Sequence, residues 1–474
     1  MTRKILFLCA LYLFPAFCHA GTQFIENFGA YPDDGYDDTD QIQAALDSGD
    51  TIYFSDGVYL IDSNLSTNNP ASINSVFLAQ NDQMATIKSS NADGNIINLK
   101  YFKGMDKFTF DNVRLRVHGI SGSGVERRVR WNEFINMNSG TWCISLDRAA
   151  SVPYNINIYQ NHFQGCHYAV AGYAAHSAIQ YNTSNNGVQR HIWMSGADNV
   201  KINNNRVTGG VVGVGFPCRD NGSDISSNTI KNNILNDISE EGISFDMQGN
   251  NQNSCSRWFS EVLGWDVDSS GDVDTLFVEG DAGNLLDIDT PSAVVVFVDS
   301  ANANKGTIYE VTGKGVSNGP FSGKPYINIA DGPASSDIQA GYQFIVLSIA
   351  VKDNQIIDNQ INNTGRTAIG LHGAGINTLI SGNTIDSCNT PPDDNQIWGG
   401  IVLRNINNAL ATKGGHGPVF FNTVSSNTLK GQGCDIKAFN LNYTGSAVFY
   451  SIGNSKQYNT LLDSADDSYW LDQE

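Results

Sequence analysis

The feature that most constrains this chain is a short repeat built on asparagine. From about residue 130 onward, an Asn is followed by any residue, an apolar residue, a small turn and a short alternating strand. The instances, of which Asn182 is the weakest, lie at Asn161, Asn182, Asn205, Asn232, Asn359, Asn383 and Asn427, at spacings of 21, 23, 27, 127, 24 and 44 residues. A unit of about 23 residues with two or three short strands is typical of one coil of a parallel β-helix, which buries its inward side chains by stacking on neighbouring coils.

The spacing of 127 residues indicates that about one hundred residues are inserted into one coil. The asparagine pattern is missing from about residue 254 to 350, where alternating β-rich runs are separated by glycine turns. We expect this segment to form a small β-barrel or sandwich that returns to an adjacent coil. The expected domains are a β-helix over 21–253, an inserted β-rich domain over 254–350, and further β-helix coils with an acidic tail over 351–474.

The amino-acid composition agrees with an all-β fold. The 474 residues include 47 Gly and 12 Pro, with many Asn and Ser, a balance that is poor in helix formers and rich in turn formers. The 28 Lys and Arg residues are outnumbered by 48 Asp and Glu residues, so the net charge is −20, and there is no basic run. Such a chain lacks the positive surface that binds nucleic acid or anionic lipid, and both are excluded as partners.

The N-terminus predicts export from the cell. Residues 1–20 are typical of a signal peptide, with a basic start at Arg3 and Lys4, an apolar core, and Ala20 at the cleavage position. No later stretch is long and apolar enough to span a membrane. The protein is therefore expected to be secreted or periplasmic, and to be a monomer.

Six cysteines remain once the signal peptide is removed, and an oxidising compartment allows them to form disulfides. The register of the coils brings these cysteines into neighbouring pairs. The predicted bonds are Cys143–Cys166, Cys218–Cys255 and Cys388–Cys434.

One amphipathic helix is expected before the solenoid, near residues 38–47, with Asp38 or Thr39 as its cap. Its apolar stripe consists of Ile42, Ala45 and Leu46. The surrounding run FGA, DG, DDT, IQ, A and GxY, over residues 28–59, resembles the N-terminal segment of the pectate-lyase superfamily of right-handed parallel β-helix proteins. We therefore predict an all-β fold: a single right-handed parallel β-helix with an N-terminal capping helix and an inserted small β-domain.

The resemblance implies a carbohydrate polymer as substrate. It leaves the reaction open, because such domains occur in polysaccharide lyases, glycoside hydrolases, mannuronan epimerases and phage tail-spike depolymerases. The candidate residues must therefore come from the coils themselves.

Aligning the coils on their main strand places three ionisable side chains in one outward row, because inward and outward residues alternate along a strand. Asp246, His372 and Arg404 stand on three consecutive coils, within about 10 Å of one another. One pleat earlier, the outward Ser244 is small and Trp193 is large. A small floor beside an aromatic side chain would suit a bound sugar chain.

Further substrate contacts are expected around this row. Arg366 aligns with Glu240 on the neighbouring coil, either as an ion pair between coils or as a substrate-binding group. Trp258, near the start of the insert, is expected to form a wall over the bound sugar, so that the insert roofs the site. For each of these residues taken alone, the alternative is an ordinary solvated or packed position on the solenoid.

The row favours removal of a proton beside a uronate carboxylate. His372 would be the base, Arg404 would neutralise the carboxylate, and Asp246 would orient the imidazole. The leading hypothesis is a polysaccharide lyase that acts on an acidic polysaccharide by β-elimination. Three alternatives stay open: a glycoside hydrolase that uses Asp246 and Glu241, a uronan C5-epimerase, and a surface protein that binds glycans without catalysis.

Calcium is the one cofactor for which the sequence holds a pattern. In the segment DVDSSGDVD, oxygen ligands that include Asp266 and Asp268 alternate, with a glycine at the sixth position. Phe277 occupies the twelfth position, where a calcium loop carries a bidentate Glu. Glu240, in a turn rich in carboxylates, is a further candidate ligand. A surface turn is the alternative in both places.

Overall fold

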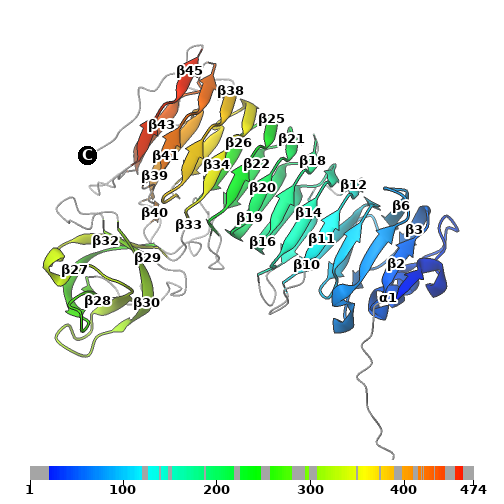
Figure 1. Cartoon of the computed structure of the whole chain (residues 1–474), viewed down its shortest axis with the longest axis horizontal. Helices are drawn as coiled ribbons and strands as arrows, with labels where there is room; N and C mark the ends of the chain where they lie inside the picture. Colours follow the sequence, from blue (N-terminus) through cyan, green and yellow to red (C-terminus); the bar gives the residue numbers. More distant parts are fainter. Residues whose placement is uncertain are drawn as a thin grey trace, which may run out of the picture.

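The computed structural model confirms the parallel β-helix (Figure 1). The structure describes residues 21–119, 126–137, 140–147, 152–185, 188–217, 225–246, 257–279, 294–297, 307–347, 351–372, 375–388, 398–408, 415–417, 419, 421–431, 433–443 and 454–462. The expected signal peptide, residues 1–20, lies outside these ranges. Successive coils contribute short strands to three long sheets that run along the solenoid.

Two of the sheets are parallel throughout the described part of the chain, with thirteen and twelve strands. The 13-stranded sheet has the order β1 (Thr22–Phe24), β2 (Thr51–Phe54), β5 (Val76–Ala79), β8 (Gly104–Asp106), β11 (Arg127–Arg130), β14 (Ile156–Tyr159), β17 (Ala178–Gln180), β20 (Lys201–Asn203), β24 (Thr229–Lys231), β34 (Gln355–Ile357), β37 (Leu379–Ser381), β41 (Thr423–Ser425) and β44 (Ser455–Gln457). The 12-stranded sheet has the order β3 (Gly57–Ile61), β6 (Ala85–Ser89), β9 (Phe108–Asp111), β12 (Glu133–Ile135), β15 (His162–Phe163), β18 (Thr183–Ser184), β21 (Arg206–Thr208), β25 (Ile234–Ile238), β35 (Gln360–Thr364), β38 (Thr384–Cys388), β42 (Thr428–Lys430) and β45 (Thr460–Leu462).

The third sheet has fourteen strands within the described residues and carries the candidate site. Its main path is β4 (Leu65–Ser66), β7 (Asn95–Leu99), β10 (Val113–His118), β13 (Trp142–Asp147), β16 (Tyr168–Ala175), β19 (Arg190–Asp198), β22 (Val212–Pro217), β26 (Glu241–Asp246), β36 (Ile369–His372), β39 (Ile401–Asn408) and β40 (Gly415–Gly417). Beside this path lie β23 (Ile225–Ser226), β33 (Val351–Lys352) and β43 (Ile436–Tyr443). β40 pairs antiparallel with β39.

The N-terminal coil is closed by α1 (Thr39–Ser48), as predicted. The helix buries its expected apolar stripe of Ile42, Ala45 and Leu46. Asp38 precedes the helix, but its carboxylate accepts the backbone N–H of Leu60 rather than one from the helix, so it ties α1 to β3. Burial raises the pKa of Asp38 to about 6. Short 3₁₀ helices occur at η1 (Ile25–Phe28), η2 (Pro70–Asn74) and η4 (Ser335–Asp337). In the described part of the chain, no helix is long and apolar enough to cross a membrane.

The repeated asparagines stack inside the solenoid as a hydrogen-bonded ladder. Each backbone N–H and each side-chain amide of one member donates to the Oδ1 of the next, at 2.9–3.1 Å. The same amide also donates to a backbone carbonyl of the preceding coil. The members are Asn132, Asn161, Asn182, Asn205, Asn233, Asn359, Asn383, Asn427 and Asn459. The ladder satisfies polar groups that the turn between two sheets would otherwise bury unpaired.

One expected repeat position is wrong by one residue. The ladder member is the buried Asn233, whereas Asn232 lies exposed before it, in the left-handed backbone region (φ 54°). The same conformation recurs before other ladder members, as at Tyr181 and Asn204. Asn232 therefore makes the turn and Asn233 makes the ladder bond, because asparagine tolerates both environments.

The insert is a closed antiparallel barrel. Its strands have the order β27 (Arg257–Val267), β28 (Val273–Val278), β31 (Pro325–Ile329), β30 (Ile308–Val316), β29 (Val294–Phe297) and β32 (Gln343–Leu347). The barrel follows β26, precedes β33, and lies beside the C-terminal half of the solenoid, with β27 against β40 (Figure 1). Asn233 and Asn359 are 126 residues apart, yet they form an ordinary ladder step. The insertion therefore leaves the stacking of the coils unchanged.

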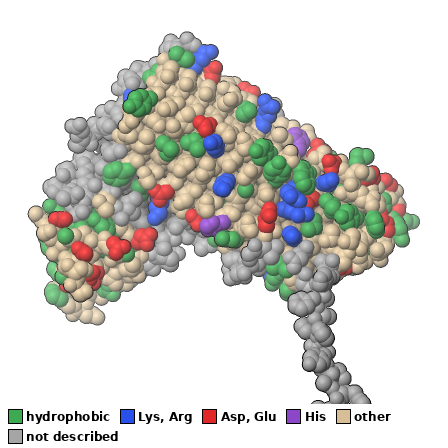
Figure 2. Space-filling model, in the orientation of Figure 1, with side chains coloured by type: hydrophobic (Ala, Val, Ile, Leu, Met, Phe, Trp, Pro, Cys, Tyr) green, Lys and Arg blue, Asp and Glu red, His purple; other side chains and the backbone are tan. Residues whose placement is uncertain are grey.

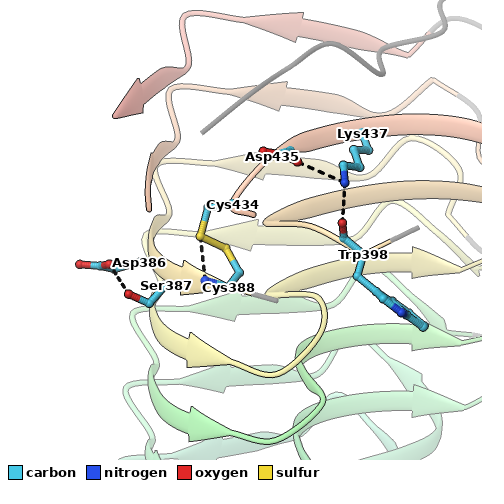
Figure 3. Close-up of a disulfide and its surroundings, with 7 residues drawn as sticks. All are labelled: Asp386, Ser387, Cys388, Trp398, Cys434, Asp435 and Lys437. Atoms are coloured by element: carbon cyan, nitrogen blue, oxygen red, sulfur yellow. Dashed lines mark hydrogen bonds and ion pairs between the residues drawn. A yellow bond between two sulfur atoms is a disulfide. The ribbon is translucent and has the colours of Figure 1, made fainter. Parts of the chain in front are cut away.

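Two of the three predicted disulfides form. Cys143 is bonded to Cys166, and Cys388 to Cys434, in each case between neighbouring coils. Figure 3 shows the bond between Cys388 and Cys434. Cys218 and Cys255 lie outside the described residues.

His191 is a titratable group buried inside the solenoid, where it is 1% exposed. Its Nε2 lies 2.8 Å from the carbonyl oxygen of Gly209, and its Nδ1 contacts the hydroxyl of Ser184. Because a carbonyl only accepts hydrogen bonds, Nε2 carries the proton and Nδ1 accepts from Ser184. Burial lowers the pKa of His191 to about 4.

We predict that replacing a ladder asparagine destabilises the solenoid. Asn205→Ala would leave the backbone N–H and the side-chain amide of Asn182 without their acceptor, and the carbonyl of Ile179 without a donor. The free energy of unfolding should fall by roughly 2–5 kcal/mol in urea denaturation, because each buried unsatisfied group costs roughly 1–3 kcal/mol. Asn203→Ala, a substitution on the outer side of β20, is the matched control and should have little effect. Equal effects of the two would contradict this role for the ladder.

We also predict that His191 makes the fold sensitive to acid. Between pH of about 6.5 and about 4, the unfolded chain binds a proton at His191 and the folded chain does not, so stability falls as the pH falls through this window. The full difference is roughly 3 kcal/mol. Denaturation midpoints from pH 7 to 4.5 should therefore decline less steeply in His191→Gln than in the wild type. Parallel declines would show that His191 is protonated in the fold.

Candidate active site

The predicted row of ionisable residues is assembled by three neighbouring strands of the 14-stranded sheet. Asp246 of β26 aligns with His372 of β36, and His372 aligns with Arg404 of β39. The preceding coil contributes β22, which aligns Pro217 with Asp246. Side chains that are 126 residues apart in the sequence therefore become neighbours.

Two of the three side chains in the row, those of His372 and Arg404, are buried from solvent. His372 is 1% and Arg404 is 3% exposed, although both point away from the solenoid interior. Asp246 and Glu241 remain partly exposed. The alternative of a solvated row is therefore wrong for His372 and Arg404, and charge at these two positions needs compensation within the protein.

The His372 ring folds back along its own strand. A Cβ atom at Gly370 would lie 2.3 Å from Nε2 of His372, so the ring occupies the space that the glycine leaves. This direction brings Nε2 to 3.1 Å from Oε1 of Glu241. Glu241 therefore contacts the ring, and the expected role of Asp246, which aligns with His372 on the neighbouring strand, stays a prediction.

Glu241 is held ionised by its neighbours. Its burial alone would raise the pKa, but the charges of His372 and Arg404, with the ring of His372 and the hydroxyl of Ser244, lower it to about 2. Nδ1 of His372 is buried without a hydrogen-bond partner among the described residues. Nε2 is also buried, and its contact in the described part of the chain is the one with the carboxylate of Glu241, so both ring nitrogens are enclosed by the protein.

Trp398 is the component of the site that the sequence analysis missed. Its ring lies 5.2 Å from the guanidinium carbon of Arg366 and 5.2 Å from that of Arg404, and it meets the His372 ring edge-on at 6.0 Å. Its backbone carbonyl accepts a 2.7 Å hydrogen bond from Nζ of Lys437 (Figure 3). Trp398 precedes β39 and so escapes an alignment of strand residues. A search for aromatic residues just before each strand would have found it.

The expected row of small residues beside Trp193 exists, and it includes Gly215 of β22. Trp193, Gly215, Ser244 and Gly370 align across β19, β22, β26 and β36. A Cβ atom at Gly215 would lie 2.3 Å from the indole of Trp193, so the tryptophan rests over this glycine. The guanidinium carbon of Arg190 lies 4.9 Å from the same indole.

Two further residues, Arg366 and Trp258, were expected to contact the substrate. Arg366 forms the alternative ion pair with Glu240, at 3.1 Å, and also packs against Trp398. Trp258 lies in β27, but its side chain is outside the described part of the chain. The predicted wall over the site therefore stays a prediction.

The residues of the calcium pattern are used in a hairpin turn. Asp268 accepts hydrogen bonds from the hydroxyl of Ser270 and from the N–H groups of Ser270 and Asp272, in the turn between β27 and β28, and these bonds lower its pKa. Asp266 belongs to β27, and Glu240 is paired with Arg366. Among the described residues, no three His, Cys, Asp or Glu side chains are grouped to hold a metal ion. Figure 2 shows acidic side chains spread over the barrel surface.

Comparison with known proteins identifies the fold. No family model and no curated protein matches this sequence. The structure is similar to the A-module of the Azotobacter vinelandii mannuronan C-5 epimerase AlgE6, with 13% identity and a TM-score of 0.53, over 94% of this chain and 97% of that chain. It is also similar to the AlgE4 A-module of the same organism (12% identity, TM-score 0.47, 95% and 100% covered) and to the Streptococcus pneumoniae surface protein and adhesin PfbA (11%, 0.47, 94% and 98%). The resemblance read from the N-terminal motif is thereby confirmed at the level of the parallel β-helix fold.

We predict that Gly370→Ala displaces the His372 ring from Glu241, since the added methyl group would occupy the position of the ring. The ring proton and carbon resonances of His372 should shift in nuclear magnetic resonance spectra, and a crystal structure should show the Nε2–Oε1 contact broken. Gly140→Ala, where an added Cβ meets nothing within 4 Å, is the control. An unchanged ring position in Gly370→Ala would mean that the glycine is not what sets its orientation.

Proposed function

We propose that this protein is a secreted enzyme that degrades an anionic, uronate-containing polysaccharide by β-elimination. The single observation that carries the proposal is the contact of His372 with Glu241 beside Arg404. An imidazole supported by a carboxylate is a base, and a neighbouring guanidinium can bind the acidic group of a sugar. The two disulfides suit a protein that works outside the cytoplasm.

The residues divide the reaction between them. His372 takes the proton from C5 of the uronate, the electron pair forms the C4–C5 double bond, and the bond from C4 to the glycosidic oxygen breaks. That oxygen takes a proton from the imidazolium or from water. Glu241 stabilises the imidazolium while it exists, and Arg404 neutralises the uronate carboxylate, which makes the C5 proton easier to remove. The polymer approaches along the partly exposed side chains of Glu241, Asp246 and Trp398.

The charge state of Glu241 assigns the roles in the hydrolase alternative, because an ionised carboxylate can be the base or nucleophile but not the acid. A glycosidase needs a carboxylic acid that is protonated at working pH, and a pKa of about 2 leaves Glu241 ionised. Asp246 would then have to supply the acid.

A C5-epimerase is the second candidate function. Removal of the same proton is also the first step of epimerisation, which ends with return of a proton to the opposite face. The similarity in fold to the A-module of a mannuronan C-5 epimerase, over most of the chain, is consistent with this second candidate function. The base and the cation would have the same roles in both reactions.

One experiment separates these functions. The protein is incubated in deuterated water with alginate, polygalacturonate, chondroitin sulfate and neutral dextran. A lyase produces unsaturated ends that absorb ultraviolet light, a hydrolase produces saturated reducing ends, and an epimerase introduces deuterium at C5 without cleavage. We expect unsaturated ends from one of the anionic polymers. Saturated ends or an inert response to every polymer would overturn the proposal.

We predict that His372→Ala lowers kcat by roughly 10²- to 10⁴-fold, which is the usual contribution of a positioned proton acceptor. Arg404→Ala should weaken both binding and turnover, and Arg404→Lys should recover only part, because lysine lacks the planar fork of donors. His162→Ala, on β15 of another sheet, is the matched control. Thermal unfolding midpoints would check that the buried substitutions leave the fold intact. Turnover within about threefold of wild type in both His372→Ala and Glu241→Gln would show that the active site lies elsewhere.

A further inference from the structure

A second cluster of charged and aromatic side chains lies on the N-terminal coils of the 14-stranded sheet. The ring of Trp142 is flanked by two guanidinium groups, with its centre 5.4 Å from the guanidinium carbon of Arg114 and 5.2 Å from that of Arg116. Beside them, Nδ1 of His118 and Nε of Arg116 each lie 3.8 Å from Oδ2 of Asp147. We call these five residues the N-terminal constellation.

The N-terminal constellation has the same composition as the candidate active site. That site also has one tryptophan between two arginines, Trp398 with Arg366 and Arg404, and a histidine beside a carboxylate, His372 with Glu241. Nothing in the coil repeat requires this, because the rest of the outer face differs from coil to coil. The two clusters therefore present the same kinds of groups on one sheet.

The register of the sheet puts both sets of side chains on one face. Arg116 aligns with Ser145, and the row continues through Ala171, Trp193 and Gly215 to the Ser244–Gly370 row of the candidate site. From β10, which carries His118, to β36, which carries His372, there are six strand spacings of ~4.8 Å, or ~29 Å along the solenoid. A polymer that runs parallel to the axis can reach both.

The midpoint between the two constellations carries a third contact of the same type. β19 lies three strands from β10 and three from β36. It presents Arg190, whose guanidinium carbon lies 4.9 Å from the Trp193 ring and 5.6 Å from the Tyr168 ring. The indole N–H of Trp193 is buried without a hydrogen-bond acceptor among the described residues. The midpoint of the face therefore carries a guanidinium group beside two aromatic rings, as each end carries guanidinium groups beside one.

The charges of the N-terminal constellation are incompletely balanced. Two guanidinium groups share one aromatic ring, and the pKa of Arg114 is lowered by burial and by the charge of Arg116. The Nε atoms of Arg114 and Arg116 are buried and have no hydrogen-bond acceptor in the described part of the chain. An external anion would relieve the repulsion between the two cations, since arginine binds carboxylates and sulfates with its planar fork.

The N-terminal constellation is also the more open of the two. The side chains of Arg116 and Asp147 are each 34% exposed and that of His118 is 18% exposed, whereas His372 is almost wholly buried. An acidic sugar can therefore reach these groups without rearrangement of the fold.

We propose that the N-terminal constellation is a second binding site for an acidic sugar of the same polymer that the candidate active site takes. The proposal rests on the proposed function for the identity of the polymer. One chain runs along the outer face of the 14-stranded sheet, and Arg190 with Trp193 contacts it between the two constellations. The enzyme thereby binds long chains better than fragments that fill only one constellation.

The test combines binding and kinetics. Retardation in gels that contain alginate, polygalacturonate or chondroitin sulfate is measured in the His372→Ala background, so that the polymer is not consumed. Adding Arg114→Gln with Arg116→Gln should weaken binding of the anionic polymer by about tenfold or more, with no change towards neutral dextran. With His372 intact, the double substitution should raise KM for long chains, leave kcat unchanged, and leave turnover of short oligosaccharides unchanged.

The controls separate this proposal from the proposed function. Arg206→Gln removes the same charge from an exposed position on β21 of another sheet and should bind like the wild type. Arg116→Gln alone, at a partly exposed position, tests the site if the double substitution lowers the unfolding midpoint. Polymer binding that is equal in the double variant and in Arg206→Gln, or dextran binding that falls in parallel, would overturn the second site. Binding that depends on Arg114 and Arg116 without turnover of any polymer would uphold the second site and overturn the lyase.

Discussion

The buried asparagine ladder is the constraint on which the rest of this structure depends. The Oδ1 of Asn233, for example, accepts two hydrogen bonds from Asn205 on the previous coil. The amide of Asn233 donates to the next member, Asn359, and to a backbone carbonyl of the previous coil. A coil that slipped by one residue would therefore leave several buried polar groups unpaired. The ladder thereby sets the register of every strand that follows it. Asn233 and Asn359 are 126 residues apart, and so are Asp246 and His372. The ladder bond between Asn233 and Asn359 therefore also sets the alignment of Asp246 with His372, because both pairs lie on the same two coils.

Once register is set, the outer face of one sheet becomes a place where ionisable groups can be held close together out of water. Glu241 stays charged in this setting because His372 and Arg404 lie near it, and their charges exceed the effect of its burial. Trp398 adds an aromatic face that two guanidinium groups share, which is favourable because the ring attracts cations. The glycine at position 370 makes the contact possible, since any side chain there would occupy the space of the imidazole. Function on a solenoid thus depends on small residues in one row as much as on reactive residues in the next.

The fold and the candidate row could be predicted from the sequence because both follow from periodicity. A repeat near 23 residues specifies coils, and alternation within a strand specifies which side chains point outward. The parts that could not be predicted lack that regularity. Trp398 precedes its strand and was not predicted at all. Glu241 begins its strand, outside the row, so the sequence named it as a carboxylate of a possible hydrolase but not as the partner of His372. The coil of Gly215 consists of valine, glycine, phenylalanine and proline over β22, so no polar side chain marked its outer face in the sequence. The slip from Asn233 to Asn232 arose because two adjacent asparagines fit two different roles, one exposed and left-handed, the other buried.

A solenoid also has a particular electrostatic relation to a polymer. Each coil adds one row at a constant ~4.8 Å step, so a ligand with its own repeat meets similar side chains again at fixed distances along the axis. The chain as a whole carries a net charge of −20, which repels a polyanion from most of the surface. The arginines that lie over tryptophans on one face are cations on a surface that otherwise repels a polyanion. Under the proposed function, an acidic polymer would be attracted to the face that carries those cations, and this restriction would align it with the solenoid axis more strictly than a uniformly positive surface would.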